Sequence, residues 1–294
     1  MFSGCITALI TPFRAGRLDV SGMRRNVRFQ IEQGCRGLLV AGSTGEAASL
    51  TETELELAIR TVRTEAKGRV PVIAGTGTNN TAKTLKAVAW LNRQKVDALL
   101  VVSPYYVKPT QEGLYRHFRA VAEGTELPII VYNIPGRTAV NIEPATIERI
   151  AKDCTNVVAV KEAAGSLDQV SDIIMRCSDR LTVLSGDDSL TLPMLAVGAC
   201  GVISVVSNIV PHAVQQMIEF FEQGRIAEAA GRHLALFPLI KAMFVESNPI
   251  PVKWAMNALG MAAGEPRLPL LPLSEKHRPM VLERLRAYGL KPRK

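Results

Sequence analysis

The sequence predicts an α/β protein, a closed (β/α)8 (TIM) barrel with a helical carboxy-terminal extension. Eight short runs rich in Val, Ile and Leu recur along 294 residues, and their starts lie about 20 to 33 residues apart with helical patterns between them. The runs are apolar throughout rather than alternating, so they need cover on both faces, which indicates parallel strands. An open, doubly wound sheet is the alternative that the pattern leaves open.

The eight predicted strands are bounded by these apolar runs. They cover residues 5–10, 37–41, 70–75, 97–103, 127–132, 156–161, 181–186 and 201–206. Runs of this length, separated by helical patterns, are typical of buried strands in repeated strand-helix units.

Two intervals carry clear helix signals. Thr51 and Glu54 form a capping box, and one face of the helix that follows is apolar, with Leu55, Ala58, Ile59 and Val62. A second amphipathic segment follows Thr110, with Leu114, Phe118 and Val121 on one face. Both segments are therefore expected to pack on the sheet.

The chain after Pro211 shows helical patterns only. We expect residues 1–225 to form the barrel, with the site at the carboxyl ends of its strands, and residues 226–294 to form the helical extension. Because no linker rich in Gly or Ser separates the two parts, the extension is expected to pack on the barrel.

Composition narrows the class of protein. With 47% hydrophobic and 21% charged residues, the chain has globular composition and can bury a large core. Its amino terminus has no basic region ahead of an apolar one, and its longest apolar run is too short and too interrupted to span a bilayer as a helix. We expect a soluble, cytoplasmic protein that does not associate with membranes.

The reactive side chains give no sign of a metal or of nucleic acid. Five cysteines form an odd set without a C-x-x-C pair, and four histidines lie far apart, so neither a disulfide framework nor a metal site is expected. The net charge is +8, but Lys and Arg are scattered, and only the tail K-P-R-K is a basic cluster. Mild attraction of small anions is the expected effect of this charge.

Unusual polar residues follow the predicted strands, where barrels of this kind place their catalytic groups. These stretches are G-S-T-G-E (42–46), G-T-G-T-N-N (75–80), P-Y-Y (104–106), Y-N-I-P-G-R-T (132–138), Lys161 with Glu162, and G-D-D (186–188). The strand starts show nothing comparable. The sequence therefore predicts a site at the carboxyl ends of the strands.

Lys161 is the main chemical candidate, because it ends an apolar strand. Desolvation in a barrel mouth would lower the pKa of its ammonium toward neutrality, and a neutral amine attacks carbonyl groups. A phenol at Tyr132, at the end of the neighbouring strand, could shuttle the protons that imine formation requires. The alternative is a lysine paired with Glu162 or another carboxylate.

Two glycine-containing loops are less specific. The loop 42–45 could hold a carboxylate with its N–H groups and hydroxyls, or it could be a plain tight turn. Gly75-Thr76-Gly77 resembles the start of a dinucleotide fingerprint, but Asn80 stands where the third glycine belongs, so a nucleotide site is not favoured.

Taken together, the motifs resemble the dihydrodipicolinate synthase family, among the pyruvate-dependent lyases and aldolases related to N-acetylneuraminate lyase. The similarity covers essentially the whole chain: G-S-T-G-E, V-I-A-G-T-G, S-P-Y-Y, Q-E-G-L-Y-R-H-F, Y-N-I-P-G-R-T, V-K-E-A-A-G, L-S-G-D-D, G-V-I-S-V and N-P-I-P-V-K-W-A. It implies 4-hydroxy-tetrahydrodipicolinate synthase activity in lysine (diaminopimelate) biosynthesis, and a homotetramer built as a dimer of dimers.

The resemblance also implies roles for individual residues. Lys161 would form the Schiff base with pyruvate, and Tyr132 would pass protons in a relay with Ser43 and Tyr106, the latter reaching in from a neighbouring subunit. Thr44 and the backbone of Ile203 would bind pyruvate. Arg137 would hold the carboxylate of L-aspartate 4-semialdehyde. No metal or organic cofactor is implied, because the protonated imine is itself the electron sink.

Two departures from the family pattern affect what is expected. Ser43 stands where the synthase usually has threonine; it keeps the hydroxyl but loses the methyl that stiffens χ1, so we expect the chemistry to survive at a reduced rate. Where lysine-inhibited members usually have histidine and glutamate, this chain has Glu52 and Lys83, although Asn79 and Tyr105 are retained. We therefore expect weak or absent inhibition by L-lysine.

Two other functions remain open at this point. A sibling Schiff-base aldolase acting on a sugar acid or hydroxy-oxo acid would be marked by loss of the Arg137 role. A barrel that binds a keto acid as a sensor, without turnover, is disfavoured by the intact Lys161 and Tyr132.

Overall fold

The computed structural model describes residues 2–293, and its eight main strands close into a barrel. Their order is β1 (Gly4–Ala8), β10 (Gly201–Ser204), β9 (Thr182–Ser185), β8 (Val157–Glu162), β7 (Ile129–Asn133), β6 (Ala98–Val102), β5 (Val72–Thr76) and β4 (Gly37–Val40). Each strand overlaps one predicted run, and the pairs from β5 to β10 and between β1 and β4 are parallel. The predicted fold class is confirmed, and the open sheet is not observed.

The chain divides into two compact units, each described by itself below. The first contains residues 2–4 and 73–203, and the second contains residues 5–72 and 204–293. The predicted boundary between a barrel part ending at 225 and an extension beginning at 226 stays a prediction. Met1 and Lys294, the outer ends of those two parts, lie outside the described residues.

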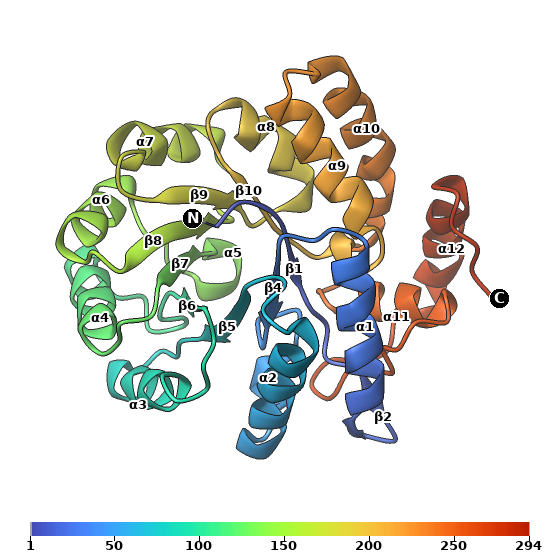
Figure 1. Cartoon of the computed structure of the whole chain (residues 1–294), viewed down its shortest axis with the longest axis horizontal. Coiled ribbons are helices and arrows are strands. Elements are labelled where there is room, and N and C mark those ends of the chain that lie inside the picture. Colours follow the sequence, from blue (N-terminus) through green and yellow to red (C-terminus); the bar gives the residue numbers. More distant parts are fainter. Residues whose placement is uncertain (1, 294) are drawn as a thin grey trace. The chain divides into compact units, whose positions relative to one another are not determined.

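The first unit alternates strands and helices from β5 to β10 (Figure 1). Its helices are α3 (Thr81–Leu91), α4 (Gln111–Glu123), α5 (Pro135–Thr138), α6 (Pro144–Asp153), α7 (Leu167–Cys177) and α8 (Thr191–Ala196), with a short 3-10 turn η2 (Asp188–Leu190). Side chains of Asn80, Thr110 and Ser166 cap α3, α4 and α7. These caps fix where each helix starts after its strand.

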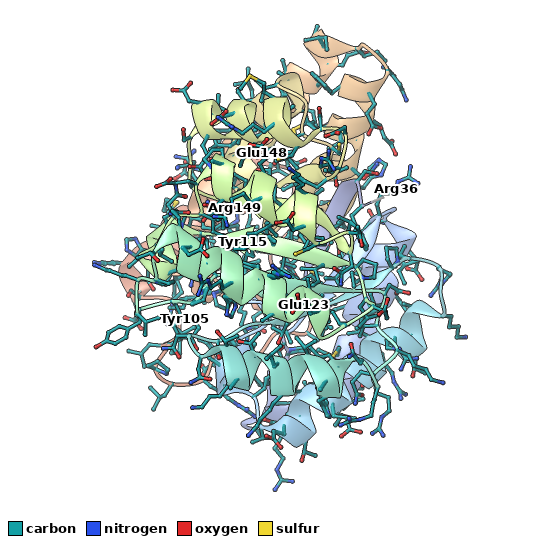
Figure 2. All side chains as sticks on the ribbon, turned by 90° about the vertical axis from the view of Figure 1, so that its left-hand side faces the viewer. Arg36, Tyr105, Tyr115, Glu123, Glu148 and Arg149 are labelled. Carbon is teal, nitrogen blue, oxygen red and sulfur yellow. The ribbon has the colours of Figure 1, made fainter. Side chains whose placement is uncertain are left out.

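The outer faces of α4, α6 and α7 are joined by ion pairs (Figure 2). Arg149 on α6 donates to Glu112 on α4 at 3.0 Å, and its guanidinium lies 4.0 Å from the ring centroid of Tyr115. Arg176 on α7 donates to Glu148 on α6 at 2.9 Å. The apolar faces of these helices pack inward, as Leu114, Phe118 and Val121 do on α4.

The second unit contains most of β1, all of β4 and the carboxy-terminal part of the chain up to residue 293. Its helices are α1 (Val20–Glu32), α2 (Glu52–Ala66), α9 (Pro211–Glu222), α10 (Ile226–Ala242), α11 (Ile250–Ala258) and α12 (Arg278–Ala287), with 3-10 turns η1 (Ala47–Ser49), η3 (Val206–Asn208) and η4 (Glu275–His277). The capping box of Thr51 and Glu54 on α2 and the purely helical region after Pro211 are confirmed. A hairpin of β2 (Phe13–Arg14) and β3 (Arg17–Leu18) was not predicted.

Buried amides tie β1 to the surrounding helices of this unit. Gln30 on α1 accepts a hydrogen bond from the Thr7 hydroxyl at 2.6 Å and donates to the carbonyl of Ser207 at 2.9 Å. Gln215 on α9 accepts from the backbone N–H of Cys5 at 2.8 Å, and Asn208 donates to the carbonyl of Ala8 at 2.8 Å. Because each buried polar group has a partner, these side chains set the position of the strand without leaving polar groups unsatisfied.

Among residues 2–293, no helix is long and apolar enough to cross a membrane. Within the same range, no group of three or more His, Cys, Asp or Glu side chains is placed to hold a metal ion.

Candidate active site

Lys161 and Tyr132 lie side by side at the carboxyl ends of β8 and β7. The two residues are register partners in the parallel ladder, so both side chains project from the same face of the sheet. The Lys161 Nζ atom is 4.1 Å from the centroid of the Tyr132 ring. Each residue is only 6% exposed. The predicted amine and phenol therefore lie next to each other and are shielded from solvent.

Burial makes the Lys161 amine reactive near neutral pH. Loss of solvent lowers its pKa to about 7; the carboxylate of Asp188 opposes this shift, and the guanidinium of Arg137 adds to it. A substantial fraction of the amine is then uncharged at pH 7, which is the form that attacks a carbonyl carbon.

The pKa of Tyr132 is shifted upward, so the phenol keeps its proton. Burial raises the pKa of the phenol to about 12, and the charge of Arg137 partly offsets that rise. The hydroxyl is therefore protonated at physiological pH; its predicted role in proton transfer stays a prediction.

Glu162 does not form the ion pair that the sequence left open as an alternative. Neighbouring residues of a strand point to opposite faces, so Glu162 lies on the face away from Lys161. Its carboxylate accepts hydrogen bonds from Asn133 Nδ2 at 3.0 Å, Gln169 Nε2 at 3.0 Å and the backbone N–H of Ala164 at 2.7 Å. Burial raises the pKa of Glu162, and these donors oppose that rise. Lys161 is thus not neutralised by its neighbour in sequence.

The other predicted residues of the first unit differ in their surroundings. Arg137 lies exposed on α5, close enough for its charge to act on both Lys161 and Tyr132. Ile203 is buried on β10. Tyr106 follows β6 with its side chain 84% exposed and with a positive φ of 73°, held by its N–H bond to the Thr138 carbonyl at 3.1 Å.

Ser43 and Thr44 belong to the second unit, in a tight turn after β4. The N–H of Gly45 donates to the carbonyl of Gly42 at 3.0 Å, which closes the turn. Ser43 is exposed, whereas Thr44 is buried and its hydroxyl accepts from Asn248 Nδ2 at 2.9 Å. The predicted turn is present; the role of its hydroxyls in binding a carboxylate stays a prediction.

The segment 75–80 contains a helix cap. The backbone N–H of Thr78 donates to the Thr84 hydroxyl at 3.0 Å, and the Asn80 side chain accepts from the N–H of Lys83 at 3.0 Å. Asn80, which replaces the third glycine of the dinucleotide fingerprint, is therefore the N-cap of α3.

Sequence reasoning missed three contributors to these surroundings. Asp188 is buried and acts on the charge of Lys161, although its stretch G-D-D was noted. Asn248 holds the hydroxyl of Thr44, and Lys253 forms a 2.6 Å ion pair with Glu46 at the end of the same turn. The stretch N-P-I-P-V-K-W-A contains both Asn248 and Lys253 and contributed to the family resemblance, but no role was predicted for either residue.

Comparisons with known proteins agree with this geometry. The sequence model of the Dihydrodipicolinate synthetase family matches residues 1–288. A relative from Pelobacter propionicus, named 4-hydroxy-tetrahydrodipicolinate synthase, is 47% identical over 290 residues, which cover 99% of this chain and 100% of the relative.

Two solved structures are also similar to the structure of this chain. The dihydrodipicolinate synthase from Thermotoga maritima superposes with a TM-score of 0.97 at 44% identity, covering 99% of this chain and 100% of its own. A monomeric variant of dihydrodipicolinate synthase gives a TM-score of 0.97 at 44% identity, covering 99% and 98%. The predicted enzyme class, a lyase, and the predicted synthase rather than the sibling aldolase are confirmed by this similarity. The chain belongs to the Dihydrodipicolinate synthetase family.

Proposed function

We propose that this chain condenses pyruvate with L-aspartate 4-semialdehyde through a Schiff base on Lys161, as a 4-hydroxy-tetrahydrodipicolinate synthase of lysine (diaminopimelate) biosynthesis. The observation that carries the proposal is the buried Lys161 amine, with a pKa of about 7, beside the Tyr132 phenol. An amine in this state is nucleophilic without any metal or organic cofactor.

The reaction begins with the imine. The uncharged Nζ atom of Lys161 attacks the keto carbon of pyruvate, and the oxygen leaves as water after it receives protons through Tyr132. The protonated imine withdraws electrons, so the methyl carbon of pyruvate loses a proton and becomes the nucleophilic end of an enamine.

Carbon–carbon bond formation and ring closure follow. The enamine attacks the aldehyde carbon of the semialdehyde and restores the imine. The amino group of the second substrate then attacks the imine carbon, closes the six-membered ring and displaces Lys161 as a free amine. The lysine is thus regenerated, and Tyr132 supplies and recovers protons at both stages.

Substrate carboxylates are held by the remaining residues. Thr44 and the backbone of Ile203 bind the carboxylate of pyruvate, and the planar fork of Arg137 binds that of the semialdehyde. The charge of Arg137 near Lys161 supports this role, since a carboxylate placed there meets a cation. Ser43 and Tyr106 complete the relay with Tyr132.

Tyr106 is proposed to act in a neighbouring copy of the chain. Its ring is exposed in the single chain, and a positive φ in a tyrosine is a strained state that a functional contact would justify. We therefore propose a homotetramer built from dimers, working in the cytoplasm, with residues 1–225 as the barrel part and 226–294 as the helical extension.

Borohydride trapping tests the Schiff base. Incubation with pyruvate and borohydride should add about 72 Da to the chain, the mass of a reduced imine, on the peptide that contains Lys161. The variant Lys161→Arg should take up no adduct. An unmodified Lys161 in the wild type would refute the mechanism and favour a keto-acid sensor.

A coupled assay tests the second substrate. With pyruvate and L-aspartate 4-semialdehyde the wild type should turn over, and the variant Arg137→Gln should mainly raise KM for the semialdehyde. A protein that forms the imine but shows negligible rate with this aldehyde would be a sibling aldolase.

A further inference from the structure

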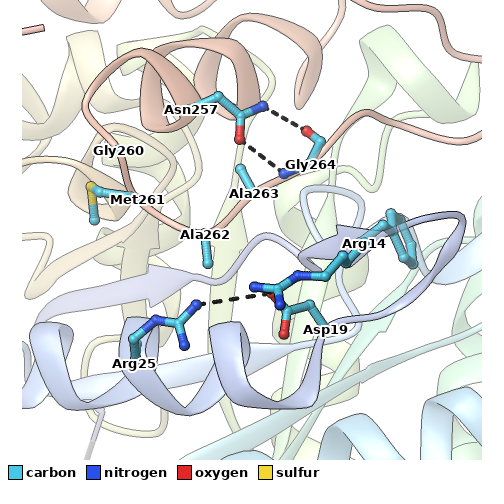
Figure 3. A pocket seen from close by; sticks show the side chains of 10 residues that line it. Arg14, Asp19, Arg25, Asn257, Gly260, Met261, Ala262, Ala263 and Gly264 are labelled. Carbon is cyan, nitrogen blue, oxygen red and sulfur yellow. Dashed lines mark hydrogen bonds and ion pairs between the residues drawn. The ribbon is translucent and has the colours of Figure 1, made fainter. Parts of the chain in front are cut away.

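The second unit contains a pocket of about 270 Å³ that the reaction above does not use (Figure 3). It lies between the β2–β3 hairpin, the first turns of α1 and the segment that follows α11. Its lining includes Arg14, Asp19, Arg25, Asn257 and residues 260–264.

Two arginines of this pocket share one carboxylate. The guanidinium groups of Arg14 and Arg25 approach Asp19 Oδ2 at 3.2 and 4.0 Å, with side chains 70% and 56% exposed. The other oxygen, Oδ1, caps α1 by accepting from the N–H of Gly22 and the hydroxyl of Ser21, each at 2.9 Å. Because each guanidinium has five N–H donors, one carboxylate oxygen cannot saturate both groups.

The basic tail places a guanidinium next to one residue of the lining. Gly260 lines the pocket, and a Cβ atom built on it would clash with Arg293 Cζ, so that guanidinium packs directly against Gly260. The tail is anchored there by the N–H of Arg293, which donates to the carbonyl of Ala258 at 2.7 Å. Arg293 belongs to the only basic cluster of the sequence, K-P-R-K.

Four hydrogen-bond acceptors of the lining already have partners. The carbonyl of Ala262 accepts from Asn26 Nδ2 at 2.7 Å, and that of Ala263 accepts from the N–H of Phe13 at 3.0 Å. The side-chain amide of Asn257 donates to the carbonyl of Gly264 and accepts from its N–H (Figure 3). The pocket therefore offers a ligand the donors and positive charge of its arginines, and Met261 and Ala262 are apolar members of its lining.

We propose that this pocket binds a phosphate group, carried by inorganic phosphate or by a small phosphomonoester. Arg14 and Arg25 against the single carboxylate of Asp19 leave one net positive charge and several N–H donors, and Arg293 beside Gly260 adds a cation next to the lining. An anion that accepts several hydrogen bonds, as phosphate does, suits these surroundings. The volume is below the range of about 300 to 1,000 Å³ that drug-sized ligands need, so a dinucleotide does not fit.

Calorimetric titration with inorganic phosphate, at pH 8 and constant ionic strength, tests the site. The wild type should show saturable binding of one phosphate per chain below about 20 mM. Arg25→Gln should weaken binding about 10-fold, and the double variant Arg14→Gln/Arg25→Gln should abolish it. The matched control is Arg36→Gln, which removes an exposed arginine with a single ion pair, to Glu219, and should bind as the wild type does.

Further titrations identify the ligand and check the fold. Glycerol phosphate binding tighter than inorganic phosphate would assign the pocket to a phosphomonoester, and the reverse would assign it to the free ion. Pyruvate trapping on Lys161 should be unchanged in every variant, which shows that each is folded. Unsaturable phosphate binding in the wild type, undiminished binding in the double variant, or equally tight binding of acetate would overturn the proposal.

Discussion

The position of Lys161 disfavours the ammonium ion, which supports the nucleophilic role proposed for its amine. Burial and Arg137 push its pKa down, while Asp188 pulls it back toward the ordinary value. The balance leaves the amine near half-protonated at neutral pH, so a large fraction is present as the free amine, the form proposed to attack the keto carbon. Arg137 and Asp188 act on this fraction in opposite directions.

The pH dependence of imine formation should reveal this tuning. In the wild type, the rate of pyruvate trapping by borohydride should rise as pH passes through about 7, because the nucleophile is the deprotonated amine. Arg137→Gln removes a charge that lowers the pKa of Lys161, so the midpoint should move to higher pH. Asp188→Asn removes a charge that raises it, so the midpoint should move to lower pH. Shifts in the same direction for both variants would contradict the assigned charges.

The burial that lowers the pKa of Lys161 should also lower the free energy of unfolding at neutral pH. Its pKa is 10.5 when unfolded and about 7 when folded, so between these values the unfolded chain binds more protons and the free energy of unfolding rises with pH. At pH 7 the burial costs on the order of 4 to 5 kcal/mol, at 1.36 kcal/mol per pKa unit. Lys161→Met should therefore unfold at higher urea concentration than the wild type at pH 7, with a difference that shrinks toward pH 10.

A matched control separates this effect from a general loss of charge. Lys86→Met removes an exposed lysine of α3 and should leave the pH dependence of unfolding unchanged. If Lys161→Met were less stable than the wild type at pH 7, the amine would be better solvated or better paired than its surroundings indicate.

At the scale of elements, α11 fixes the turn that carries Ser43 and Thr44. Lys253 on this helix is fully buried and donates to Glu46 at 2.6 Å and to the carbonyl of Thr11 at 3.0 Å. Glu46 ends the turn in the left-handed conformation, with φ of 52°, and its second oxygen accepts from the N–H of Arg267 at 2.9 Å. The buried charges thus define the backbone path directly after Thr44.

Breaking this ion pair should be costly. Lys253→Met leaves the Glu46 carboxylate buried without its cation, which is expected to lower the free energy of unfolding by about 3 to 5 kcal/mol. The double variant Lys253→Met/Glu46→Gln removes both charges and should lose less than the single variant. Urea unfolding of Lys253→Met, of Glu46→Gln and of the double variant measures the coupling energy between the two side chains. Additive losses would show that the pair contributes no coupling energy.

Patterns along the chain predicted the elements better than the contacts between them. Continuous apolar runs identified all eight barrel strands, and Lys161 stood out because a charged residue ended such a run. The β2–β3 hairpin was missed because two-residue strands around Ala15 and Gly16 have no apolar run to mark them. Lys253 was missed for a related reason: a lysine on an amphipathic helix gives no sign in sequence that its partner is Glu46, 207 residues away.

At the scale of the whole molecule, the predicted response to L-lysine concerns residues that follow different strands. Tyr105, which the resemblance links to L-lysine, is exposed and projects outward after β6 (Figure 2). Lys83, which stands where the resemblance implies glutamate in lysine-inhibited members, is exposed on α3. An ammonium group of L-lysine that approached Lys83 would meet a like charge instead of a carboxylate.

Inhibition by L-lysine should therefore be weak or absent. In a steady-state assay with both substrates, we expect less than half inhibition at about 1 mM L-lysine, because like charges at close range oppose binding. Lys83→Glu supplies the carboxylate and should strengthen inhibition, whereas Lys86→Glu, on the same helix, should not. A micromolar inhibition constant for the wild type would contradict the prediction.

If two copies of the chain share their active sites as proposed, mixing two inactive variants should restore activity. If Tyr106 acts in a neighbouring subunit, Lys161→Ala and Tyr106→Phe inactivate different halves of one site, and each variant alone should be nearly inactive. In a mixed dimer, however, the chain with intact Lys161 receives an intact Tyr106 from its partner. Random 1:1 mixing places both variants in half of the dimers, with one working site of two, so activity should return to about a quarter of the wild type. Separately purified variants should therefore regain activity only after they are unfolded and refolded together. Activity that stayed at the level of the single variants would mean that each chain uses its own Tyr106, and the exposed ring would then have to fold back over its own strand β6.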